Sequence, residues 1–165
     1  MTEFDPERLL RALVKHEVEF CVIGATAAWL QGSPAVTVDL DVTPRRDLDN
    51  ANRLATALNS LGARRPGTDA PAELDGADFL GGDAQRFDTA AGPIDVVPHA
   101  AAIGGFEDMA TVELSLGDVS IRAITIDAVI ASKEKLGRPK DLAALPALYA
   151  AREAVRQRRE SMGET

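Results

Sequence analysis

The sequence predicts an α/β (α+β) fold in which a mixed β-sheet is flanked by helices. Segments with helical periodicity alternate with short apolar runs over residues 5–62, and two-residue alternation recurs in 84–99 and 111–124. The chain then turns helical, which predicts a C-terminal helical element at 126–160. No internal repeat and no sharp change of composition divides the chain, so we expect a single domain over residues 1–165.

The first elements follow from capping signals and short apolar runs. Asp5 and Pro6 supply the N-cap and the first helical residue of a helix. The apolar run 20–24 ends in glycine and predicts a buried strand. An alanine-rich segment follows it, which predicts a short helix closed by Gly32.

The next segment alternates apolar and polar residues. This pattern covers 36–44 and predicts a strand with one apolar and one polar face. Asp47 is the expected cap of a helix that runs through Leu61. The stretch 63–82 is rich in Gly, Pro, Ala and Asp with little periodicity, so we expect it to be mostly loop.

Each of the two later alternating segments is expected to form two strands joined by a turn. The turns are predicted at Ala91–Gly92 and at Gly117–Asp118, because these residues favour tight reversals. The helical element should break at Arg138–Pro139, and Pro146 predicts an early kink or a fresh start in the last helix.

Composition and charge exclude several classes of protein. Cys21 is the single cysteine, which excludes a disulfide framework and a cysteine-based zinc site and favours a reducing, cytoplasmic setting. No run reaches about 18 apolar residues and the N-terminus is charged, so we expect no membrane partner. The net charge of -8 argues against nonspecific coating of nucleic acid. Residues 133–165, however, carry eight Lys and Arg against five acids, so this segment is either an anion-facing surface or a solvated helix face.

Three aspartates are candidates for a metal site. Asp39 and Asp41 are two residues apart on an expected strand, so their carboxylates leave the same face and repel each other unless a cation compensates. Oxygen ligands without nearby His or Cys suit Mg²⁺ or Mn²⁺. Asp95 could join them if its strand lies beside theirs, and three such carboxylates can hold two metals about 3.5–4 Å apart. The alternative is a solvated pair of aspartates on a surface strand.

A glycine turn precedes the aspartate pair. Gly24 ends the first predicted strand, and the short helix begins around Ala25 and Thr26. Backbone N–H groups at such a start attract anions, and glycine allows a phosphate to approach closely. We therefore expect these residues to receive the phosphates of a nucleotide.

These motifs together resemble a known superfamily. Gly24–Ala25, then Asp39-Leu40-Asp41, then Asp95 on a later strand is similar to the pattern of polymerase-beta-like nucleotidyltransferases. The sequence SKEKLGRPKDLAALPAL at 132–148 resembles the Lys and Arg-x-Lys-Asp element of the AbiEii-like nucleotidyltransferases, best known as toxins of toxin–antitoxin pairs. The resemblance implies a minimal nucleotidyltransferase fold.

The resemblance also implies roles for particular residues. Asp39 and Asp41 would hold the metals, and Asp95 would complete the acidic triad and help to deprotonate the acceptor hydroxyl. Lys133 would contact a nucleotide phosphate, and Asp141 would belong to the C-terminal part of the active site. Asp141 has an alternative interpretation as the N-cap of the last helix.

The chain departs from the family pattern in two places. Ala25 stands where the family usually has Gly or Ser, so Thr26 or Thr37 would have to supply a hydroxyl contact to the nucleotide. The interval between the lysine and the aspartate of the C-terminal element is short, which leaves Lys135 or Lys140 as alternative phosphate ligands.

The function implied by the resemblance is transfer of a nucleoside monophosphate from an NTP to an acceptor hydroxyl, with release of pyrophosphate. The implied acceptor is RNA, in particular a tRNA 3′ end, and the implied partner is an antitoxin protein. Two alternatives stand beside it. One is a nucleotidyltransferase acting on a protein or a small molecule such as an antibiotic, and the other is a non-catalytic NTP-binding module.

Overall fold

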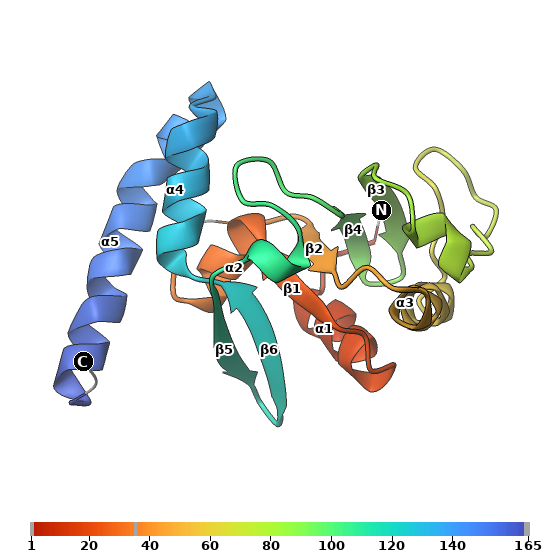
Figure 1. Ribbon diagram of the computed structural model, residues 1–165, viewed down its shortest axis with the longest axis horizontal. Coiled ribbons are helices and arrows are strands. Elements are labelled where there is room, and N and C mark those ends of the chain that lie inside the picture. The colour runs from red at the N-terminus through yellow and green to blue at the C-terminus, as the bar shows by residue number, and fades with distance from the viewer. Residues whose placement is uncertain (1, 35, 164–165) are drawn as a thin grey trace.

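A computed structural model, which describes residues 2–34 and 36–163, contains a six-stranded mixed sheet flanked by five helices (Figure 1). This arrangement confirms the predicted fold class. Two short 3₁₀ turns, η1 and η2, lie in the loops. The elements in chain order are α1 Pro6–Lys15, β1 Phe20–Ile23, α2 Gly24–Leu30, β2 Leu40–Pro44, α3 Leu48–Ser60, η1 Gly76–Phe79, β3 Gln85–Thr89, β4 Gly92–Val96, η2 Phe106–Asp108, β5 Thr111–Leu116, β6 Val119–Ile124, α4 Ile126–Leu136 and α5 Pro139–Ser161.

The sheet has the strand order β3-β4-β2-β1-β6-β5. The two predicted hairpins, β3–β4 and β5–β6, are antiparallel and form its two ends. The central strands β1 and β2 are antiparallel to each other, and each pairs in parallel with one strand of a hairpin. All four residues of β1 are buried, as expected for a central strand covered on both faces.

Helices α1 and α3 begin as their caps predict. Asp5 accepts a hydrogen bond from the backbone N–H of Arg8, and Pro6 is the first residue of α1. Asp47 caps α3 in the same way by accepting from the backbone N–H of Asn50. Helices α4 and α5 lie together at one end of the molecule, with the β3–β4 hairpin at the other end (Figure 1).

The predicted strand at 36–44 is wrong in its first half. The strand begins only at Leu40, and Val36 and Val38 are 90% and 66% exposed. The reason is that β1 ends at Ile23 opposite Asp41, where the chain turns into α2, so residues before Leu40 have no partner strand on that side. Asp39 therefore lies just before β2, not within it.

The last helix also differs from the prediction. Helix α5 runs without a break through Pro146, so there is no fresh start at that residue. Its buried residues Leu145 and Leu148 continue one apolar face across the proline, and packing of that face on α4 offsets the missing hydrogen bond. Asp141 is not the N-cap, because Pro139 takes the first helical position and places the cap at Arg138.

Two remaining expectations concern the long loop and membranes. The stretch 63–82 is mostly loop, as predicted, with the single 3₁₀ turn η1. Among residues 2–34 and 36–163, no helix combines the length and the apolar character needed to cross a bilayer.

Candidate active site

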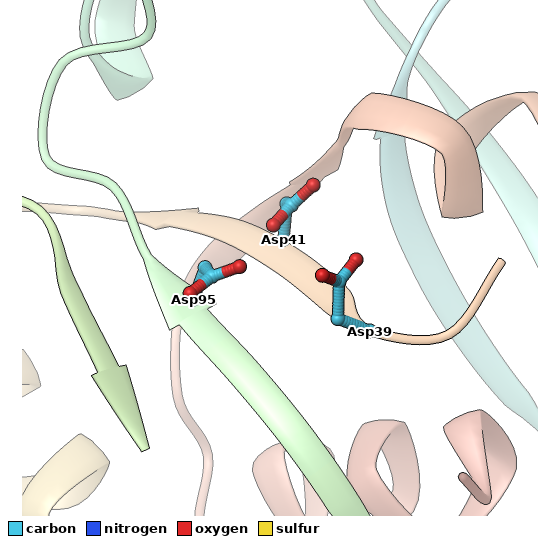
Figure 2. Close-up of side chains that lie close together, drawn as sticks. All are labelled: Asp39, Asp41 and Asp95. Carbon is cyan, nitrogen blue, oxygen red and sulfur yellow. The ribbon is translucent and has the colours of Figure 1, made fainter. Parts of the chain in front are cut away.

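Three carboxylates meet where β2 and β4 run side by side. The parallel register places Asp41 directly opposite Asp95, and Asp39 lies just before β2. Ligand oxygens of all three side chains lie within 4.8 Å of one another, and Figure 2 shows them gathered at one point of the sheet. The structure thus brings together the three aspartates that the sequence singled out.

Two threonines hold the backbone of Asp39. The hydroxyl of Thr26 donates to the Asp39 carbonyl at 3.0 Å, and the hydroxyl of Thr37 donates to the same oxygen at 2.9 Å. Thr26 is buried and the two hydroxyls lie 3.4 Å apart. Both side chains are therefore engaged in placing Asp39, which has no strand partner of its own to fix it.

Gly24 allows the chain to pass close to Asp41. Its φ is +66°, a left-handed conformation that glycine adopts without strain. A Cβ at this position would lie 2.5 Å from Oδ2 of Asp41. The turn from β1 into the seven-residue helix α2 therefore requires glycine for two independent reasons, its conformation and its contact with the carboxylate.

The three carboxylates strongly affect one another. Burial raises the pKa of Asp41 to about 7, assisted by its hydrogen bond with Asp95 and by the negative charges of Asp39 and Asp95, while Lys133 opposes the shift. A divalent cation would relieve this repulsion. Three hard carboxylate oxygens at this separation fit such a cation, so the residues present could hold a metal.

Arg86 is a site residue that sequence reasoning missed. Its Nη1 donates to Oδ2 of Asp95 at 3.0 Å and to Oδ2 of Asp39 at 3.2 Å. Arg86 lies on β3 directly opposite Asp95 in the β3–β4 register. The turn lies at Ala90–Ala91, one residue before the predicted Ala91–Gly92. Counting outward from the predicted turn would have paired Asp95 with Asp88, so the sequence pointed to the wrong residue of β3.

A second charged cluster joins α4 to α5. Asp141 is fully buried and accepts from Arg138 Nε at 2.6 Å and from Lys133 Nζ at 3.4 Å. It also accepts from the backbone N–H of Arg138 at 3.2 Å. The Arg138 hydrogen bonds lower the pKa of Asp141 to about 2, with a further contribution from Lys133, so Asp141 is ionised at neutral pH.

A cavity of about 420 Å³ joins the two clusters. Asp41 and Asp95 line it from the sheet, and Lys133 and Arg138 line it from the helical end. Carboxylates that could bind a metal ion and basic side chains that could bind a phosphate therefore face each other across this cavity.

The other residues considered for phosphate binding are placed differently. Lys135 and Lys140 are both exposed and do not line this cavity. Among the three candidate lysines, Lys133 alone lines the cavity that Asp41 and Asp95 share. Ala25 follows Gly24 in α2 and supplies no side-chain hydrogen bond.

No protein-family model and no curated protein sequence matches the chain. Several solved structures are similar to this chain. The lincosamide antibiotic adenylyltransferase LnuA, in its lincomycin-bound form, matches with a TM-score of 0.62 and 14% identity over 92% of this chain and 99% of that chain. ANT(2″)-Ia in complex with adenylyl-2″-tobramycin matches with a TM-score of 0.55 and 14% identity over 93% and 95% of the two chains. The chain has a nucleotidyltransferase fold.

The nucleotidyltransferase fold extends over most of the chain. A Thermotoga maritima protein described as a nucleotidyltransferase shares it with a TM-score of 0.52 and 13% identity, over 88% of this chain and 94% of that chain. At 13–14% identity these similarities show the fold alone. Membership of the AbiEii-like family stays a prediction.

Proposed function

We propose that the protein is a metal-dependent nucleotidyltransferase that transfers a nucleoside monophosphate from an NTP to an acceptor hydroxyl and releases pyrophosphate. The observation that carries the proposal is the convergence of Asp39, Asp41 and Asp95 within 4.8 Å on a nucleotidyltransferase fold. The cavity lined by Asp41 and Asp95 is also lined by Lys133 and Arg138, which supply the positive charge that a triphosphate needs.

The roles of the side chains follow from their charges and positions. Asp39, Asp41 and Asp95 would hold Mg²⁺ or Mn²⁺, and the bound cation would lower the pKa of the attacking hydroxyl and neutralise charge on the leaving pyrophosphate. In the reaction a bond forms between the acceptor oxygen and the α-phosphorus, the bond from that phosphorus to the pyrophosphate oxygen breaks, and Asp95 accepts the hydroxyl proton. Phosphoryl transfer depends mostly on positioning and charge neutralisation, so these groups are chemically sufficient.

Lys133 is the proposed phosphate ligand of the helical end. It is held at the cavity wall by Asp141, whose buried carboxylate also binds Arg138. Two cations around one anion leave a surplus of positive charge facing the cavity. Asp141 accordingly acts as a positioning residue, and Lys135 is the less favoured ligand because it is exposed outside the cavity lining.

For the acceptor we propose RNA, in particular a tRNA 3′ end, with the chain acting as the toxin of a toxin–antitoxin pair. The support is the resemblance of residues 132–148 to the AbiEii-like element, together with the contacts that Lys133, Arg138 and Asp141 of this stretch make with one another. The exposed Arg156 and Arg159 on α5 offer a surface for RNA phosphates.

A small-molecule hydroxyl is the second candidate acceptor. The observation that favours it is the similarity to LnuA and ANT(2″)-Ia, whose structures contain lincomycin and adenylyl-2″-tobramycin. The net charge of the chain is -8. Outside the basic C-terminal helices, this charge favours a cationic small molecule over a polyanion such as RNA.

The test is incubation with Mg²⁺ and each labelled NTP in turn, with total RNA in one series and a panel of hydroxylated antibiotics in another. Asp41→Ala is the control variant. We expect label in an RNA band with the parent chain and none with Asp41→Ala. Label in an antibiotic but not in RNA would move the acceptor to the second candidate, and parent and variant that behave alike in every assay would contradict catalysis.

The RNA surface is tested separately. Arg152 pairs with Asp127 at 3.7 Å and Arg158 donates to the Gln31 carbonyl at 3.2 Å, so reversing these two would also disturb the fold. The double variant Arg156→Glu and Arg159→Glu avoids those contacts. We expect it to weaken RNA binding while leaving NTP binding unchanged, and equal RNA affinity would contradict this surface.

A further inference from the structure

We infer that Arg86 is the internal counter-cation of the three-carboxylate cluster, bound to Asp39 and Asp95 until a divalent cation displaces it. The inference deepens the proposed function and rests on it, because it assigns to Arg86 the regulation of metal entry at that site. It predicts that Arg86 weakens metal binding and stabilises the folded chain when no metal is bound.

The placement of Arg86 is fixed by the sheet. Its register partner across the β3–β4 hairpin is Asp95, and Asp95 in turn pairs with Asp41 across β4–β2. Side chains of directly opposed residues leave the same face of a sheet, so the guanidinium is delivered onto the carboxylates by strand pairing alone. The two hydrogen bonds of 3.0 and 3.2 Å follow from that placement.

The electrostatic reason for an arginine at this point is the crowding of negative charge. Three carboxylates within 4.8 Å repel one another in the folded chain, and the cost grows where solvent is partly excluded. One guanidinium bridging Asp39 and Asp95 offsets part of that repulsion with two charge-assisted hydrogen bonds. The same two carboxylates are the proposed metal ligands, so Arg86 and a cation compete for them.

Arg86 has both the freedom and the space to leave. Its side chain is 43% exposed, which makes it the accessible member of the pair it forms with each aspartate. It lines the 420 Å³ cavity and also a second cavity of about 610 Å³ that is bordered by Val38, Asp88 and Pro93. Asp88 lies two residues further along β3 on the same face, so we expect its carboxylate to attract the guanidinium once Arg86 leaves the cluster.

The test measures Mn²⁺ binding calorimetrically, without nucleotide, for the parent chain, Arg86→Gln and Arg86→Lys. We expect Arg86→Gln to lower the Mn²⁺ dissociation constant by about tenfold or more, because it removes both charge-assisted hydrogen bonds that compete with the metal. Arg86→Lys keeps the positive charge but loses the planar guanidinium that bonds to two carboxylates at once. The Mn²⁺ dissociation constant of Arg86→Lys should therefore lie between those of the parent chain and Arg86→Gln. Arg86→Gln should also unfold at a lower temperature in EDTA and regain that loss when Mn²⁺ is added.

The matched control is Arg64→Gln. Arg64 borders the second cavity beside Arg86 and pairs with Asp69 at 3.8 Å, so its loss removes the same charge from the same region without touching the metal ligands. The inference is overturned if the Mn²⁺ dissociation constant of Arg86→Gln equals or exceeds that of the parent chain. It is also overturned if Arg64→Gln lowers the Mn²⁺ dissociation constant by the same factor as Arg86→Gln. Transfer of labelled nucleotide by the parent chain is scored in parallel. A shifted Mn²⁺ affinity without any transfer would refute the proposed reaction alone, and transfer without the shift would refute the role of Arg86 alone.

Discussion

A Cβ atom on Gly24 would lie 2.5 Å from the carboxylate oxygen Oδ2 of Asp41. Ile23, the residue before this glycine, is the register partner of Asp41, so the turn out of β1 passes directly over the side chain that β2 presents. The glycine is thus part of the geometry of the carboxylate cluster as well as the start of α2.

Gly24→Ala should abolish nucleotide transfer, because the added methyl group must push Asp41 away from Asp39 and Asp95. It should also lower the free energy of unfolding by ~1–3 kcal/mol through the left-handed φ of +66°. The measurements are initial transfer rate and urea unfolding. Gly62→Ala is the matched control, because Gly62 has a φ of +67° and open space where its Cβ would lie. It should lose stability and keep activity, and a fully active Gly24→Ala would refute the close contact.

Thr26→Val tests whether the two threonine hydroxyls act on Asp39 or on the nucleotide. The substitution removes the hydrogen bond to the Asp39 carbonyl without changing the side-chain shape. We expect kcat to fall about tenfold with little change in KM for the NTP, as for the loss of one buried hydrogen bond that positions a ligand. A raised KM at constant kcat would instead indicate direct contact with a phosphate.

Thr43→Val is the control for this experiment. Thr43 is also a buried threonine near the site on β2, and its hydroxyl has no hydrogen-bond partner among the residues that the structure describes. Its removal should leave kcat unchanged and leave stability equal or slightly improved, because an unsatisfied polar group is replaced by a methyl group.

Asp41 should make the metal-free chain less stable as pH rises. Its pKa is raised from 3.8 in the unfolded chain to about 7 when folded, so between those values the folded state binds more protons than the unfolded state. The free energy of unfolding therefore falls as pH increases from ~4 to ~7. Asp41→Asn stays neutral and lacks this loss, so in EDTA at pH 8 it should be more stable than the parent by ~1–3 kcal/mol.

Urea unfolding at pH 5 and pH 8 in EDTA measures this difference between the parent chain and Asp41→Asn. Addition of Mn²⁺ at pH 8 should reverse the order, because the parent binds the cation more tightly and is stabilised by linkage. The prediction fails if the two proteins keep the same difference in stability at both pH values.

Asp141→Asn should weaken NTP binding more than it slows the chemical step. The buried carboxylate holds Lys133 and Arg138 at the cavity wall, and the neutral amide would release both cations. We expect KM for the NTP to rise about tenfold with a smaller change in kcat. Asp127→Asn is the control, because it breaks another pairing between α4 and α5, with Arg152 at 3.7 Å, that does not border the cavity. Equal effects of the two variants would mean that Asp141 serves only to join the helices.

Local features of the fold were predictable because they depend on neighbouring residues. Asp5 and Asp47 cap their helices by accepting from N–H groups three residues away, and the tight turn at Gly117–Asp118 sets the register of β5 and β6. The same logic failed at Val36 and Val38, where alternation is present but β1 ends at Ile23 and leaves no strand to pair with them on that side. Residue periodicity shows that a segment is suited to be a strand. Whether the strand forms depends on a neighbouring strand with which it can pair.

Residue patterns along the chain were enough to predict the order of the helices and strands, the caps of α1 and α3, and the candidate aspartates and lysines of the site. Folding of the whole chain was needed to place β2 beside β4 with Asp41 opposite Asp95. It was also needed for Arg86 to bridge Asp39 and Asp95, and for Lys133 to line the cavity that Lys135 does not line. The physical reason is that capping and periodicity involve residues a few positions apart, whereas the partner of a strand depends on how the whole sheet buries its apolar faces. A charged site built across three strands and two helices therefore exists only once that packing is complete.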